Sequence, residues 1–195
     1  MKEVNKVETR VSDNFEYLRY ISETTDQKAI LRELMTAYGD DVWNYAFSIC
    51  RRADLADDIT QDVFLKVYRK LTSFRGESSV KTWLLTITRH TALDYKRSAF
   101  WRKVTLVDMV APQGSHRSAE HEALEQMAVN EIWELVLSMP QKYREVLILF
   151  AHYQLSMKEI ADILDLSVGT VKSRLHHARM NILKAKERRK DETKS

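Results

Sequence analysis

Residues that turn or cross-link a chain are scarce in this sequence. Its 195 residues include only 4 glycines, 2 prolines and one cysteine, Cys50. A fold rich in β-strands needs more glycines and prolines at its turns, so this scarcity favours helices. A single cysteine excludes an internal disulfide and argues against a cysteine-based zinc site. We expect an all-α protein without a metal ion or another cofactor.

Long apolar runs and catalytic motifs are missing as well. No apolar stretch approaches the roughly 20 residues that cross a membrane, and residues 1–5 lack the apolar run of a signal peptide. No glycine-rich phosphate loop and no pairing of a nucleophile with a base is visible. We therefore expect a cytoplasmic protein that is not an enzyme, has no small-molecule substrate and does not insert into membranes.

Positive charge is present but unevenly distributed. The net charge is only +3. From Val168 to Lys190, however, eight lysines and arginines face a single acid, Glu187. Such a basic stripe is typical of nucleic-acid binding. A solvated helix end is the alternative, because cations also suit the C-terminus of a helix.

Hydrophobic periodicity divides the chain into two helical segments. Apolar residues recur at helical spacing from near Gln27 to near Arg97, with interruptions at Gly39 and at residues 74–79. The pattern then disappears and returns from about Ala123. We predict two all-helical domains joined by a flexible linker. The predicted boundaries are a partly disordered extension at 1–24, a first domain at 25–98, a linker at 99–122, a second domain at 123–188 and a tail at 189–195.

The second segment contains a helix-turn-helix pattern between Ser156 and about Ala185. Ser156 and Glu159 have the spacing of a capping box, and Ser167 can cap the helix that follows a short turn. That helix has an apolar stripe and a polar, basic opposite side. The stripe consists of Val168, Val171, Leu175, Ala178 and Ile182. A second helix of this kind fits the major groove of DNA, although an ordinary helical hairpin is the alternative.

Two adjacent histidines, His176 and His177, lie on the polar side of this predicted helix. Neighbouring side chains on a helix point about 100° apart, so the pair is poorly placed to chelate one metal ion. No further ligands stand nearby in sequence. We interpret both histidines as contacts to the groove or to phosphate.

The first segment carries two polar surfaces of opposite character. An acidic ridge, which consists of Asp57, Asp58, Gln61 and Asp62, should bind a basic protein partner unless it is merely a solvated face. On the following helix, cations alternate with aromatic residues, a mixture that suits single-stranded nucleic acid. These residues are Lys81, Arg89, Lys96 and Arg97 with Trp83, His90 and Tyr95. Trp83 itself fits the core better than the surface.

Several motifs together resemble those of bacterial RNA polymerase sigma factors. Residues 57–64, 74–76, 81–90 and 92–97 are similar to region 2 of that family. Residues 137–146 and 167–175 are similar to region 4, and nothing between them resembles region 3. This layout is similar to the extracytoplasmic-function subgroup. The N-terminal extension is longer than this resemblance leads us to expect.

The resemblance implies roles for particular residues. The acidic ridge corresponds to the helix that docks on core RNA polymerase. The capture of an unstacked base of the minus-ten element is assigned to Phe74, Arg75, Lys81, Arg89, His90, Asp94, Lys96 and Arg97. Recognition of the minus-thirty-five element is assigned to Ser167, Thr170, Lys172, Ser173, Arg174, His176, His177 and Arg179. His90 replaces an asparagine that is common in the family, and His176-His177 replaces a more usual aromatic-arginine pair.

The resemblance thus implies a dissociable polymerase subunit that recognises promoter DNA and helps to open it. An anti-sigma factor, often membrane-bound in this subgroup, is an implied partner. Two alternatives remain open at this point. One is a helix-turn-helix regulator that is not a polymerase subunit, with a first domain that senses a ligand or dimerises. The other is a helical adaptor or anti-sigma protein that binds polymerase without DNA.

Overall fold

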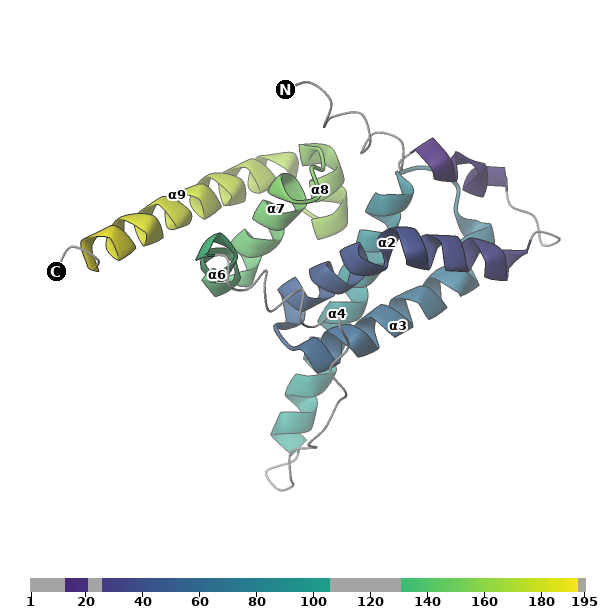
Figure 1. Cartoon of the computed structure of the whole chain (residues 1–195), viewed down its shortest axis with the longest axis horizontal. Coiled ribbons are helices and arrows are strands. Elements are labelled where there is room, and N and C mark those ends of the chain that lie inside the picture. Colours follow the sequence, from purple (N-terminus) through teal and green to yellow (C-terminus); the bar gives the residue numbers. More distant parts are fainter. Residues whose placement is uncertain (1–12, 21–25, 106–130, 193–195) are drawn as a thin grey trace. The chain divides into compact units, whose positions relative to one another are not determined.

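The computed structural model describes residues 13–20, 26–105 and 131–192, and these ranges are helical without a strand (Figure 1). The chain separates into two compact units, Met1–Thr105 and Leu106–Ser195. The all-α prediction with two helical domains is therefore confirmed. No helix within the described ranges is long and apolar enough to cross a membrane.

The first unit is a packed group of three long helices. They are α2 (Gln27–Cys50), α3 (Ala53–Lys70) and α4 (Val80–Thr105), with the short 3₁₀ helix η3 (Leu71–Ser73) after α3. Asp26 caps α2 by accepting hydrogen bonds from the backbone N–H groups of Lys28 and Ala29. The helix ends at Arg51, whose φ of 59° is left-handed and turns the chain toward α3.

The core of this unit consists of one apolar stripe from each helix. The stripe of α3 was visible in the sequence, because Ile59, Val63 and Val67 recur every four residues. All three are completely buried. Facing stripes on α2 and α4 are also buried to at least 99% and comprise Leu34, Val42, Tyr45, Ala46, Ile49, Leu84, Leu85 and Ala92.

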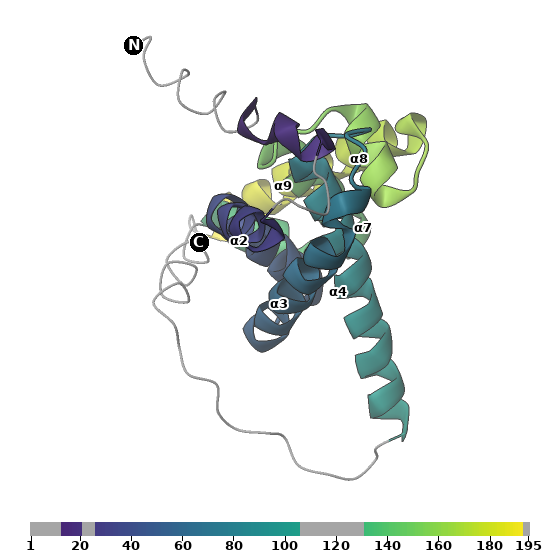
Figure 2. The same ribbon diagram turned by 90° about the vertical axis from the view of Figure 1, so that its right-hand side faces the viewer.

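The predicted break at Gly39 and the predicted end of the fourth helix near Arg97 were wrong. The chain does not break at Gly39, because α2 continues through it to Cys50. A helical glycine costs only about 1 kcal/mol relative to alanine, less than the burial of the flanking apolar residues contributes. Similarly, α4 does not end near Arg97 but continues to Thr105, into the predicted linker (Figure 2). The remainder of the predicted linker lies outside the described residues.

Part of the N-terminal extension, which was expected to be partly disordered, is folded. These residues form the 3₁₀ helix η2 (Asp13–Tyr20). Phe15 is 4% exposed and Leu18 is 1% exposed. The Phe15 ring lies 5.6 Å from the ring of Tyr38 on α2, between centroids. Burial of these two apolar side chains stabilises η2 against the first unit, although much of the surrounding sequence is polar. Residues 1–12 and 21–25 lie outside the described residues.

The second unit contains α6 (Glu131–Ser138), α7 (Gln141–Ala151), α8 (Met157–Leu164) and α9 (Val168–Glu192). The predicted capping box is present at the start of α8, where Ser156 and Glu159 bond reciprocally. Asp165, with a φ of 53°, makes the turn between α8 and α9. The last helix was predicted too short, because α9 continues through the predicted boundary at residue 188 to Glu192.

A buried arginine holds the turn between α6 and α7. Arg144 is only 5% exposed. Its Nη1 atom donates to the carbonyl oxygens of Leu137 and Met139, each at 2.8 Å. These carbonyls belong to the end of α6 and the following turn, where the helix itself supplies no partner. A charged donor therefore supplies hydrogen bonds to two backbone acceptors at this turn.

We predict that Arg144→Ala lowers the free energy of unfolding of the second unit by about 3 kcal/mol, since it removes a buried charged donor from two backbone carbonyls at this turn. Hydrogen–deuterium exchange of the full chain measures this as faster exchange in α6 and α7. Lys142→Ala removes an exposed cation two residues away and should leave exchange unchanged. Equal exchange in the Arg144 and Lys142 variants would contradict this role.

Candidate nucleic-acid and protein interfaces

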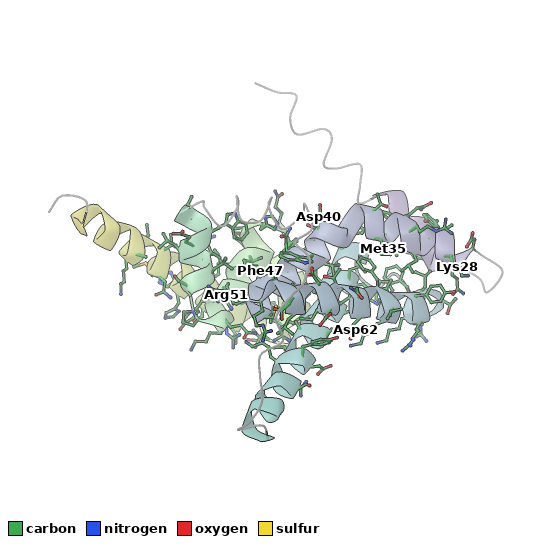
Figure 3. All side chains as sticks on the ribbon, turned by 60° about the horizontal axis from the view of Figure 1, so that its bottom comes forward. Lys28, Met35, Asp40, Phe47, Arg51 and Asp62 are labelled. Carbon is green, nitrogen blue, oxygen red and sulfur yellow. The ribbon has the colours of Figure 1, made fainter. Side chains whose placement is uncertain are left out.

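The acidic ridge on α3 is only partly available to a partner. Asp58 and Gln61 are exposed. Asp57 is exposed as well, but one of its carboxylate oxygens accepts a hydrogen bond of 2.6 Å from the indole N–H of Trp43. Asp62 is half-buried and accepts from the Tyr95 hydroxyl at 2.6 Å (Figure 3 labels Asp62). Two ridge residues therefore also connect α3 to its neighbouring helices.

An apolar residue extends the ridge, and the sequence analysis missed it. Leu65 lies one helical turn after Gln61, and its exposed fraction is 54%. The sequence could have indicated its exposure, because Leu65 is out of step with the buried stripe and so lies on the polar side of α3. The ridge and Leu65 together form a surface of negative charge next to an exposed leucine. Protein interfaces commonly combine an apolar contact with charged residues at the rim.

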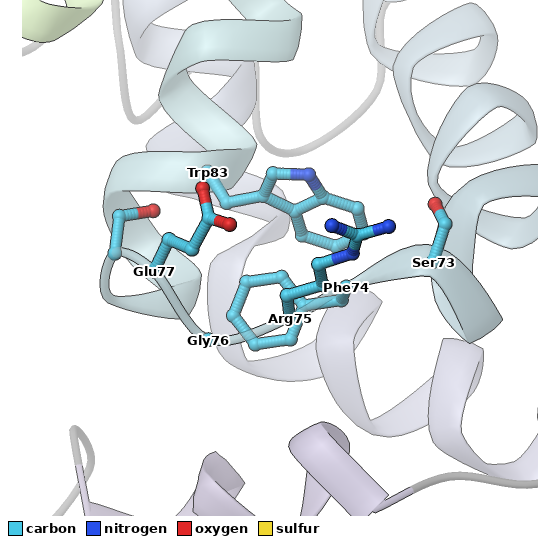
Figure 4. A pocket seen from close by; sticks show the side chains of 7 residues that line it. Ser73, Phe74, Arg75, Gly76, Glu77 and Trp83 are labelled. Atoms are coloured by element: carbon cyan, nitrogen blue, oxygen red, sulfur yellow. The ribbon is translucent and has the colours of Figure 1, made fainter.

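The loop between η3 and α4 surrounds a pocket. An open cavity of about 450 Å³ is lined by residues 73–78 and Trp83, and Figure 4 shows their side chains around it. Phe74 is only 8% exposed, and its ring centroid lies 4.9 Å from that of Trp83. Phe74 therefore supports the pocket from the core side, whereas Arg75 is exposed at its surface.

Local hydrogen bonds determine where this loop ends. Ser79 caps α4, because its hydroxyl accepts from the backbone N–H of Thr82 at 3.1 Å. Gly76 has a φ of +69°, a left-handed conformation that side chains with a β-carbon rarely adopt. The glycine allows the chain to reverse between the buried Phe74 and the start of α4.

The predicted DNA-binding side chains of α4 fall into two groups. Lys81 forms an ion pair of 3.2 Å with Asp41 on α2, and Arg89 is half-buried. His90, Lys96 and Arg97 are exposed farther along the helix. Asp94 is also exposed and pairs with Arg97 at 2.6 Å. The exposed group therefore supplies the positive charge that a DNA strand could contact, while Lys81 joins two helices.

The start of α9 has the geometry of a recognition helix. Ser167 caps it by accepting from the backbone N–H of Thr170 at 3.1 Å, as predicted. The two hydroxyls also lie 2.9 Å apart, so both residues contribute to the cap. Val171, Leu175 and Ala178 are at most 2% exposed. The side chains that remain on the outward face are Lys172, Ser173, His176, His177, Arg179 and Met180.

Aromatic residues of α7 orient two outward side chains of α9. The His177 ring stacks on Tyr143 with centroids 5.8 Å apart, and its Nδ1 atom lies 2.8 Å from the Ser173 carbonyl oxygen. The Arg179 guanidinium lies 5.2 Å from the centroid of the Phe150 ring. His176 is exposed, whereas the predicted Arg174 is half-buried. The face therefore presents His176 outward, while His177 and Arg179 rest against the body of the unit.

Both units match known families. The family described as Sigma-70 region 2 matches residues 34–102, and the family described as Sigma-70, region 4 matches residues 130–182. The first match contains the acidic ridge, the pocket loop and the exposed side chains of α4. The second contains the helix-turn-helix.

Whole-chain relatives support the same assignment. RNA polymerase sigma factor YlaC of Bacillus subtilis (strain 168) is 31% identical over 156 residues, which cover 79% of this chain and 90% of the relative. The ECF RNA polymerase sigma-E factor of Haemophilus influenzae is 32% identical over 164 residues, 79% of this chain and 85% of the relative.

Solved structures share the fold. The sigma factor RpoE of Bartonella quintana, in complex with the anti-sigma factor NepR, has a TM-score of 0.64 at 24% identity and covers 80% of this chain and 96% of its own. CnrH, in complex with the cytosolic domain of CnrY, has a TM-score of 0.61 at 23% identity and covers 87% of this chain and 95% of its own. The order of motifs, the two helical units and the relatives lead to one conclusion: this chain belongs to the sigma-70 family, as a sigma factor of the extracytoplasmic-function (ECF) subgroup.

Proposed function

We propose that this sigma factor divides its task among three surfaces. The acidic ridge with Leu65 docks on core RNA polymerase, the pocket loop and exposed α4 side chains hold the melted minus-ten strand, and α9 recognises the minus-thirty-five element. The observation that supports this division most directly is the segregation of charge. Acids are exposed on the first half of α3, although Arg69 and Lys70 are exposed at its end. By contrast, Lys96 and Arg97 are exposed on α4 beside Asp94, and cations are exposed on the outward face of α9. Like the family in general, the chain would act in the cytoplasm and without catalysis.

The experiment that tests the proposal is transcription in vitro with purified core polymerase. Adding the full chain should give initiation at defined start sites that core polymerase alone does not use. A helix-turn-helix regulator would instead bind a palindromic operator without producing such starts. An adaptor protein would bind core polymerase but give no salt-dependent binding to promoter DNA.

Docking on polymerase is supported by the accessible part of the acidic ridge. Asp58 and Gln61 are exposed, and the 54% exposed Leu65 follows on the same side of α3. An exposed carboxylate attracts a basic partner and speeds its association. The adjacent leucine adds apolar contact area that water leaves on binding. Asp57 and Asp62, by contrast, accept hydrogen bonds from Trp43 and Tyr95, so changes there would disturb the fold as well as the interface.

We predict that the double variant Asp58→Lys and Gln61→Lys binds core polymerase at least about tenfold more weakly, a loss of about 1.4 kcal/mol. Fluorescence anisotropy of the labelled full chain measures this affinity. Asp40→Lys is the matched control, because Asp40 is exposed on α2 and lies at the edge of the unit opposite Asp62 in Figure 3. Unchanged affinity in the double variant would remove the ridge from the interface.

Capture of a melted base is supported by the shape and surroundings of the pocket. Its volume of about 450 Å³ falls within the range of about 300–1,000 Å³ that is usual for small-ligand sites. The half-buried Trp83 and the exposed Arg75 give it an aromatic wall and a cation. Stacking and phosphate contacts there would offset the few kcal/mol that unpairing a base costs.

Recognition of the minus-thirty-five element is supported by the cap and exposure of α9. Residues at the start of a recognition helix contact base edges in the major groove. Lys172, Ser173 and His176 are exposed within the first turns after the Ser167 cap. Cations near the C-terminal end, such as Lys184, are placed to contact phosphates, which add affinity without sequence preference.

We predict that Lys172→Ala with His176→Ala lowers the preference for the upstream element over a scrambled element by about tenfold, because base contacts discriminate by about 1–3 kcal/mol each. Holoenzyme binding to both DNAs over a range of salt concentrations measures this. Lys184→Ala should weaken binding to both DNAs equally and reduce its salt dependence. An equal loss on both DNAs for the Lys172 and His176 variant would show that these residues do not read bases.

Regulation by an anti-sigma factor belongs to the same proposal. RpoE and CnrH, which share this fold, were solved with the anti-sigma factor NepR and the cytosolic domain of CnrY. We propose a comparable partner for this chain. Such a partner would act by covering the acidic ridge or the outward face of α9, because occlusion of either surface is sufficient to prevent promoter binding by the holoenzyme.

A further inference from the structure

The N-terminal helix η2 is attached to the first unit at several points. Phe15 and Leu18 are almost fully buried. Between them, the Tyr17 hydroxyl donates a hydrogen bond of 2.8 Å to the Glu33 carboxylate on α2. Partial burial, together with this bond and the nearby negative charge, raises the pKa of Tyr17 to about 12.

The residue that follows these anchors contacts the pocket loop. η2 lies beside the loop that joins η3 to α4 (Figures 1 and 2). The Arg19 side chain lies directly against Gly76. A β-carbon at position 76 would collide with Nε of Arg19 and would be only 2.5 Å from both its Cγ and Cδ. A side chain at position 76 would therefore meet two obstacles, the φ of +69° and the space that Arg19 occupies.

Gly76 is itself a wall of the proposed base-binding pocket. The loop has backbone hydrogen bonds at its two ends, from Phe74 N to Leu71 O at 3.3 Å and from Trp83 N to Ser79 O at 3.0 Å. Arg19 provides a contact near its middle from a distant part of the chain. The match to Sigma-70 region 2 begins only at residue 34, so η2 lies outside the part of the chain that this family match covers.

We propose that η2 is part of the minus-ten site, and that Arg19 is a positioning residue whose aliphatic chain holds the pocket loop through Gly76. The inference rests on the proposed function of that loop. A loop that is already ordered before DNA arrives loses less conformational entropy on binding, so it binds its base more tightly and more selectively. The N-terminal segment would therefore set how sharply the first unit discriminates between bases.

The test uses holoenzyme made from core polymerase and full-length variants. The probe is promoter DNA with a pre-melted bubble whose minus-ten positions are randomised on the non-template strand. Bound DNA is sequenced to obtain the enrichment of each base. Arg19→Ala removes the aliphatic chain and the charge, whereas Arg19→Met keeps a chain of similar length without the charge. Arg32→Ala is the matched control, because it removes an exposed arginine from α2.

We expect Arg19→Ala to reduce the enrichment of the preferred base by about tenfold, while Arg19→Met and Arg32→Ala stay within about twofold of the wild type. Hydrogen–deuterium exchange of residues 74–79 should accelerate in Arg19→Ala alone. Core polymerase affinity should be the same in all variants. Gly76→Ala should also lower enrichment, and adding Arg19→Ala to it should restore part of the loss, because the steric collision is removed.

Three results would overturn the inference. If Arg19→Met loses as much enrichment as Arg19→Ala, the guanidinium contacts DNA directly and the positioning role is wrong. If Arg75→Ala abolishes base selection but Arg19→Ala leaves it intact, the loop binds the base without help from η2. If the wild type itself selects no base, the proposed function of the pocket fails and the inference fails with it.

Discussion

Every helix of the two units buries one apolar stripe, and this constraint decides which side chains remain available to partners. On α3, Ile59, Val63 and Val67 have no exposed surface. Successive residues of a helix point about 100° apart, so burial of that stripe turns Asp58 and Gln61 outward. Burial of the corresponding stripe on α9 exposes its basic face in the same way. The proposed binding surfaces are therefore consequences of core packing.

The proposed polymerase surface and the proposed DNA surface are also directly connected. Asp62, on the acidic ridge, accepts a hydrogen bond of 2.6 Å from Tyr95. Tyr95 lies on α4, one position before the exposed Lys96. A half-buried bond of this kind to a charged acceptor is worth more than a neutral one. It adds to the buried stripes in joining α3 to α4, at the point where the proposed polymerase surface meets the proposed DNA surface.

Features that depend on neighbouring residues in the chain were predictable. The buried stripes, the Ser156 capping box and the Ser167 cap follow from spacing alone, and the structure contains each of them, except that the predicted stripe of α9 is exposed at Val168 and only half-buried at Ile182. Helix ends were predicted less well. A glycine at position 39 and a fading pattern after Arg97 suggested breaks, but both helices continue. Helix propensity differs by no more than about 1 kcal/mol per residue, proline excepted, and tertiary packing readily outweighs it.

The sequence by itself determined the helical class, the two units, the caps and the faces on which acids and bases appear, because these follow from composition and helical period. The tertiary structure decided what each polar or aromatic residue does on its face. It placed Phe74 against Trp83, paired Lys81 with Asp41 and set Arg19 on Gly76. Such contacts join residues that are far apart in the chain, and periodicity carries no information about which of them will meet.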